Sequence, residues 1–218
     1  MIYHNVVVCD LRHIITVEEA RRIESISNVV MLILPGDAPH EVQEALAAVP
    51  KQNVVTTLYL KANDRTSILN GSALLGNGDF PPEGEAHFVV NGVAVIEDLA
   101  EARKGDFVIN GIMILHSRLK NHTGLRFSSL NGPKGYVEFD DYKLFSDEVD
   151  VDAAFMEFLP ERTLIVCGDT IRVAPDVSLD MLRAKKPYFA AGNEIHCSCT
   201  VSGYVKANSL SGNGVIVR

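Results

Sequence analysis

A short phrase built around Asn-Gly recurs along this chain at nearly constant spacing. Phe-Val-Val-Asn-Gly-Val at 88–93 returns as Phe-Val-Ile-Asn-Gly-Ile at 107–112, and related phrases stand at 68–75 and 129–132. The spacings between successive asparagines are 21, 19 and 21 residues, for Asn70, Asn91, Asn110 and Asn131. Such a period is typical of one coil of a solenoid, in which equivalent strands stack in parallel.

The other common meaning of Asn-Gly is a hairpin turn, and the length of the repeat argues against it. A two-residue hairpin would be followed at once by its partner strand. Here the apolar run 93–96 leads instead into a charged segment, and then the phrase returns. In a solenoid, glycine supplies the bend between two sides of a coil. We expect each asparagine to stack inward on that of the next coil, with its amide hydrogen-bonded along the stack.

Variants of the phrase extend the series toward both ends of the chain. A form without glycine occurs at Asn5, Asn28 and Asn53. Further along, Cys167 takes the asparagine place before a glycine, and degenerate copies end at Asn193 and Asn208. The region 133–163 gives no clear coil assignment.

Helix signals are confined to the regions near the two ends. A capping box at 16–19 begins one helix, and the segments 37–48, 150–159 and 178–183 carry further start signals or apolar faces. The sequence therefore predicts a mainly β fold: a right-handed parallel β-solenoid with an Asn-Gly corner ladder and leucine-rich-repeat-like helical sides near both ends. We expect one continuous domain, 1–218, with α/β coils at 1–60, mostly β coils at 61–149 and mixed coils with short helices at 150–218.

This Asn-Gly periodicity, over about 60–215, resembles that of bacterial single-stranded right-handed β-helix proteins. They include the pectate-lyase-like superfamily, in which Asn ladders occur, and more distantly the bactofilins, which are short polymerising β-helices. The chain departs from bactofilins in its helical coils and its longer, uneven repeat. The resemblance implies a fold and carries over no functional residue.

Composition and charge exclude several classes of partner. The net charge of −8 argues against a general nucleic-acid binder and against docking on anionic lipid. No apolar stretch approaches the roughly 20 residues that span a bilayer, and no signal segment opens the chain. Four scattered cysteines fit reduced, buried thiols better than a disulfide framework. We expect a cytoplasmic protein with no nucleic-acid or membrane partner.

Carboxylates gather at 138–152, where they could serve catalysis or simply solvation. They are Glu138, Asp140, Asp141, Asp147, Glu148, Asp150 and Asp152. Strand alternation would place Glu138, Asp140 and Tyr142 on one exposed face. Two carboxylates about 7 Å apart could form the acid/base pair of a glycosidase or bind Ca²⁺. The interpretation that we favour is a solvated face with a helix N-cap at Asp150 or Asp152.

His196, Cys197 and Cys199 are the residues that most resemble a metal site. A Cys-x-Cys pair lacks the usual two-residue gap, and only one histidine is near. On a strand, both thiols would face the core and His196 the outside, which is the arrangement that we expect. We expect His116 and His122 to be exposed loop residues. The sequence thus assigns no catalytic, cofactor-binding or metal-binding residue.

Both ends of the expected solenoid lack an amphipathic cap. The strand 6–9 precedes the first helix, and the apolar strand 214–218 closes the sequence. Uncovered strand edges of this kind pair readily with another chain. The sequence therefore predicts a non-enzymatic, self-associating β-solenoid that acts as a scaffold or interaction protein. The alternative is a carbohydrate-active enzyme or carbohydrate-binding β-helix that uses the acidic face at Glu138 and Asp140.

Overall fold

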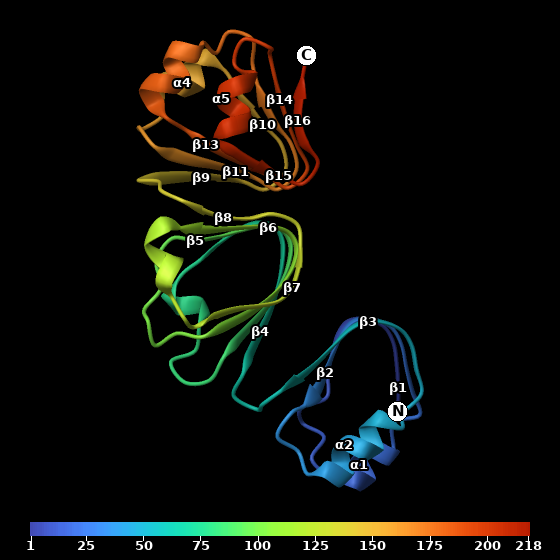
Figure 1. The fold of residues 1–218 in the computed structure, drawn as a ribbon. Helices are drawn as coiled ribbons and strands as arrows, with labels where there is room; N and C mark the ends of the chain where they lie inside the picture. The colour runs from blue at the N-terminus through green and yellow to red at the C-terminus, as the bar shows by residue number, and fades with distance from the viewer. The chain divides into compact units, whose positions relative to one another are not determined.

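The computed structural model describes the whole chain, residues 1–218, as a mainly β protein with parallel sheets (Figure 1). The chain divides into two compact units, Met1–Asp64 and Arg65–Arg218. One cluster of buried side chains fills the first unit, and three fill the second. The helices are short, and none combines the length and the apolar character needed to cross a membrane.

The first unit alternates strands and helices in the order expected for 1–60. Its elements are β1 (Ile2–Asp10), α1 (Val17–Arg21), β2 (Ser25–Pro35), α2 (His40–Ala47) and β3 (Lys51–Leu60). The three strands form one parallel sheet in the order β1-β2-β3. Side chains from the strands and both helices share one core. The predicted capping box is confirmed, because Thr16 and Glu19 each accept a hydrogen bond from the backbone N–H of the other.

The second unit begins with long strands that repeat the Asn-Gly phrase. These strands are β4 (Arg65–Leu75), β5 (Ala86–Ile96), β6 (Gly105–His116), β7 (Leu125–Asn131) and β8 (Lys134–Val137), with two 3₁₀ turns, η1 (Asn77–Asp79) and η2 (Ser117–Asn121). The sheet order is β4-β5-β6-β7, and β8 also pairs with β6. Each strand from β4 to β6 continues through its Asn-Gly pair, and all pairings are parallel. The hairpin interpretation is thereby excluded.

The rest of the second unit is built from shorter strands and three helices. Its elements are β9 (Asp141–Phe145), β10 (Val149–Val151), α3 (Ala153–Phe158), β11 (Thr163–Cys167), β12 (Ile171–Val173), α4 (Leu179–Lys185), β13 (Tyr188–Ala191), β14 (Glu194–Cys197), α5 (Ser202–Ala207), β15 (Ser209–Ser211) and β16 (Gly214–Val217). They form two parallel sheets, β15-β13-β11-β9 and β10-β12-β14-β16. The expected repeat at Asn208 is wrong, because this residue ends α5, a helix that the sequence did not indicate.

A continuous apolar run in β5 is explained by burial on both of its faces. Ala94 and Ile96 pack into the core inside the β4–β7 strands. Val93 and Val95 point the other way, into a cluster shared with the sheet that contains β11 and β13. Strands buried on both faces lose the polar alternation of a half-exposed sheet. This second layer of packing joins the two strand groups into one unit.

The asparagines stack in register as predicted, but they stack on the outside. The side chains of Asn70, Asn91, Asn110 and Asn131 are linked by hydrogen bonds of 3.1, 3.2 and 3.1 Å. All four are exposed or only partly buried, so the expected inward orientation is wrong. The following glycines allow the close approach between strands. A Cβ on Gly92 would lie 2.1 Å from the carbonyl oxygen of Gly71.

The ladders are separate, whereas the sequence predicted one continuous series of coils. Within the second unit, no strand pairing joins β7 to β9. A second ladder links Asn5, Asn28 and Asn53, and a third links Asn193 and Asn213. In the third, the amide residue follows the glycine instead of preceding it. The expectation that Cys167 takes the place of a ladder asparagine is wrong, because Cys167 is a fully buried core residue.

Candidate functional site

Glu138 and Asp140 lie in the connection between β8 and β9, and Arg162 bridges them. Nη2 of Arg162 is 2.8 Å from Oε1 of Glu138, and its Nε is 3.2 Å from Oδ2 of Asp140. The hydrogen bond and charge of Arg162 lower the pKa of Glu138. A general acid requires a raised pKa, so this environment suits an ionised binding group better than the acid of a glycosidase pair.

Tyr142 does not share the face of these carboxylates, which corrects the expectation for 136–142. The connection between β8 and β9 interrupts the strand, so alternation does not carry through it. Tyr142 packs instead against the apolar cluster between the two strand groups.

Two further acidic residues of 138–152, Asp152 and Glu148, have structural roles. The helix N-cap expected at Asp150 or Asp152 is Asp152, whose Oδ1 accepts a 2.7 Å hydrogen bond from the amide of Phe155. Glu148 holds Arg172 through two hydrogen bonds of 2.7 and 2.8 Å. These contacts agree with the solvated-face interpretation.

The His-Cys-Ser-Cys segment divides its three candidate ligands among different environments. Cys197 ends β14 and lies in the core, as predicted. Cys199 is exposed, so its expected core position is wrong, because strand alternation stops where β14 stops. Nε2 of His196 is 2.9 Å from Oε2 of Glu194. No group of three or more His, Cys, Asp or Glu side chains in the chain is arranged to hold a metal ion.

His116 and His122 both use their ring nitrogens to hold backbone groups. His116 is only 9% exposed, so the expectation that it is an exposed loop residue is wrong. Its Nε2 lies 3.0 Å from the carbonyl oxygen of Phe139, and its Nδ1 accepts a hydrogen bond from the amide of Arg118. His122 is partly buried and is hydrogen-bonded to the carbonyl of Ala100. Nδ1 of His122 accepts a hydrogen bond from the amide of Gly124, so both nitrogens of each ring are engaged with backbone groups.

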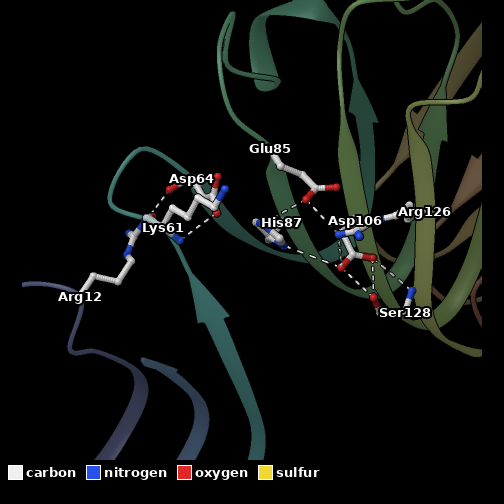
Figure 2. Close-up of polar contacts among 8 residues, drawn as sticks. All are labelled: Arg12, Lys61, Asp64, Glu85, His87, Asp106, Arg126 and Ser128. Carbon is white, nitrogen blue, oxygen red and sulfur yellow. Dashed lines mark hydrogen bonds and ion pairs between the residues drawn. The ribbon is translucent and has the colours of Figure 1, made fainter. Parts of the chain in front are cut away.

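The structure assembles one polar cluster that sequence reasoning missed, at the starts of β5, β6 and β7. Figure 2 shows Glu85, His87, Asp106, Arg126 and Ser128 pointing toward one another. Nη2 of Arg126 is 2.9 Å from Glu85 and 3.4 Å from Asp106. The hydroxyl of Ser128 donates a 2.7 Å hydrogen bond to Asp106. His87 is 8% exposed, with Nδ1 3.9 Å from Oδ2 of Asp106.

The order of groups in this cluster does not activate a nucleophile. A nucleophilic serine needs the imidazole next to its hydroxyl, with the carboxylate behind the imidazole. Here the carboxylate of Asp106 lies between Ser128 and His87. The cluster therefore cross-links three neighbouring strands by charge and hydrogen bonds.

A hollow lined by residues of β10, β12 and β14 and by Arg218 has a volume of about 330 Å³. Its charged or polar lining consists of Asp150, Arg172, His196, Ser198 and Arg218. Arg172 is already paired with Glu148, and His196 with Glu194. The charges around the hollow are thus balanced in part by the protein itself, and they select no ligand class.

The sheet of the first unit has two open edges. β1 pairs only with β2 on one side, and so does β3 on the other. β1 is nine residues long and contains no lysine or proline, the residues that commonly protect an edge strand. It exposes apolar side chains, with Ile2 65% and Val7 61% exposed. A long, apolar and unprotected edge is a site for pairing with a further strand.

The asparagine ladder of this sheet has two chemically different ends. Nδ2 of Asn28 donates to Oδ1 of Asn5 at 3.0 Å, and Nδ2 of Asn53 donates to Oδ1 of Asn28 at 2.9 Å. Asn5 thus keeps an unused amide donor at the β1 edge, and Asn53 keeps an unused carbonyl acceptor at the β3 edge. The open edges and the ladder ends together form the candidate interaction surface.

Comparisons of the chain with models of protein families, with curated proteins and with solved structures found no match.

Proposed function

We propose that the protein is a non-enzymatic, self-associating β-solenoid that serves as a scaffold or interaction platform. The observation that carries the proposal is the β1 edge: nine residues with an unpaired side, exposed apolar side chains and neither lysine nor proline. Natural sheets usually protect such an edge by charge, proline or a covering segment. An edge without this protection fits a surface that another chain covers.

The solenoid part of the proposal is supported by the strand register. Strands that follow one another in sequence pair in parallel, with asparagine opposite asparagine and glycine opposite glycine. Parallel neighbours require a crossover connection, and such connections are almost always right-handed. A right-handed solenoid is therefore the architecture that we propose for these repeats.

A second candidate function is carbohydrate binding at Glu138 and Asp140. The observation that favours it is the bridging Arg162, which fixes two exposed carboxylates in one place. Fixed carboxylate and guanidinium groups can hydrogen-bond sugar hydroxyls. Titration with acidic and neutral oligosaccharides tests this candidate, with Glu138→Gln as the loss-of-binding variant. Binding that survives this substitution would reject the site.

We also propose a cytoplasmic location, since all four cysteines are free thiols and reducing compartments favour such thiols. Cell fractionation tests this location.

The main proposal is tested by size-exclusion chromatography with light scattering over a wide concentration range. We expect mass to rise with concentration, and Val7→Lys to shift the distribution toward monomer. Phe158→Lys is the matched control, because it places the same charge at an 85% exposed apolar residue of the second unit. A monomer at every concentration would reject self-association, and equal effects of the two variants would reject the β1 edge.

A further inference from the structure

We infer that self-association is head-to-tail: the β3 edge of one copy pairs in parallel with the β1 edge of the next, with Asn53 opposite Asn5. This inference rests on the proposed function and specifies its geometry. It commits to a second copy of this chain as the occupant of the open edge.

The ladder chemistry makes the two edges complementary to each other. Every link joins Nδ2 of the later asparagine to Oδ1 of the earlier one. The β1 edge therefore ends in a donor and the β3 edge in an acceptor. Reversing all three carboxamides would reverse the direction and would still leave one donor end and one acceptor end. Two β1 edges meeting each other would bring like groups together.

The backbone bend also matches between these two edges. Asn5, Asn28 and Asn53 have φ values of 57, 54 and 54°, so all three strands bend at the same place in the left-handed conformation. The other long strands bend at glycine instead, as at Gly92, where φ is 140°. A strand that continues the sheet of the first unit in register must share its bend. In a second copy, β1, β2 and β3 all have this bend. Of these, β3 has its unpaired side on the edge opposite to β1, so it can continue the sheet beside β1 in parallel.

Side-chain burial shows what an added neighbour would cover. Val29 in the middle strand is 1% exposed, whereas its register partners Val6 and Val54 at the two edges are only partly buried. On the outer face, Val30 is 41% exposed between Val7 at 61% and Val55 at 76%. Pairing β3 with the β1 of a second copy would give both edges the environment that β2 already has.

A head-to-tail contact joins two different surfaces, so it leaves an unused edge at each end of a dimer. Such heterologous contacts produce rings when the rotation closes and open filaments when it does not. The inference therefore predicts assemblies that extend beyond two copies.

Disulfide trapping tests the geometry, because in-register neighbours in a sheet lie within the Cα separation that a disulfide accepts. Val7→Cys and Val55→Cys are made separately in full-length protein that also carries Cys199→Ser. Equal amounts of the two variants are mixed and oxidised with diamide. We expect cross-linked dimers in the mixture, little cross-linking in either variant alone, and a ladder of covalent multimers from the double variant.

The outcomes separate this inference from the proposed function. Cross-linking of Val7→Cys with itself would indicate an antiparallel β1–β1 dimer and overturn the head-to-tail geometry, while self-association would stand. Association of the reduced variants without any cross-link would likewise overturn the geometry. Variants and wild-type protein that all stay monomeric in light scattering would reject the proposed function itself.

Discussion

Asn28 donates a 3.0 Å hydrogen bond to Asn5, and both residues hold the left-handed backbone conformation. The two properties belong together, because the bend leaves the Asn28 side chain exposed while the next residue, Val29, stays in the core. Asparagine is one of the few residues other than glycine that adopt this conformation readily. In the first unit, asparagine therefore both bends the strand and forms the ladder hydrogen bond. In the β4–β6 strands of the second unit, glycine bends the strand and the preceding asparagine forms the hydrogen bond.

Replacing Asn28 separates its conformational role from its hydrogen bonds. Asn28→Ala loses two ladder hydrogen bonds, each worth about 0.5–1.5 kcal/mol, and adds about 1–2 kcal/mol of strain in the left-handed region. We expect the free energy of unfolding to fall by about 2–5 kcal/mol in urea titrations. Asn28→Gly loses the same hydrogen bonds without the strain and should lie about 1 kcal/mol closer to wild type. Equal losses would show that the bend is not strained.

Gly111 should tolerate no side chain. A Cβ there would lie 2.0 Å from the carbonyl oxygen of Gly92, on a backbone with φ of 154°. We expect Gly111→Ala to lower the free energy of unfolding by more than about 3 kcal/mol or to prevent folding, as measured by thermal unfolding and soluble yield. Gly78→Ala is the matched control, since nothing lies within 4 Å of that Cβ, and it should change stability by less than about 0.5 kcal/mol. A stable Gly111→Ala protein would mean that the strands can move apart.

The thiols should differ sharply in reactivity. Burial and the neighbouring Asp10 raise the pKa of Cys9 to about 11, and burial also raises the pKa of Cys167 and of Cys197. The thiolate is the reactive form, so these residues should react slowly at pH 8. Exposed Cys199 should give the single fast thiol in an Ellman titration of native protein. Cys199→Ser should abolish the fast phase, and unfolded wild type should titrate all four thiols. A fast phase that persists would contradict the burial of the others.

The repeat was readable from the sequence because its spacing is nearly constant and its asparagines face one another in register. The orientation of the ladder was not readable, since alternation cannot tell which side of a bend faces solvent. The polar cluster had a partial signal: His87 and Asp106 each stand four residues before a ladder asparagine. Arg126, the register partner of Asp106, lies five residues before Asn131, because a bulge shifts the register between β6 and β7. Alignment by sequence alone would have placed it wrongly.

The Arg162 bridge had no comparable signal. Arg162 reaches Glu138 and Asp140 from just before β11, the strand that pairs with β9, and it has a φ of 54°. Neither that conformation nor the pairing follows from any pattern around the carboxylates.

Asp10 should make the first unit sensitive to acid. Burial opposes its ionisation, but hydrogen bonds from the side chain and amide of Arg12 outweigh burial and lower the pKa of Asp10 below its ordinary value of 3.8. Arg12 also donates to the carbonyl oxygens of Lys61 and Asp64 within the same unit (Figure 2). Because the folded-state pKa is lowered, the ionised pair stabilises the fold above about pH 4, and this contribution is lost as pH falls through the folded-state pKa.

The measurement is the free energy of unfolding as a function of pH for wild type and Asp10→Asn. The variant should be less stable at pH 6, and the difference should shrink steadily as the pH falls below about 4. Asp180→Asn, at a side chain that is 94% exposed, is the surface control and should follow the wild-type curve. A difference between wild type and Asp10→Asn that stays constant down to pH 2 would show that the pairing with Arg12 does not depend on the charge of Asp10.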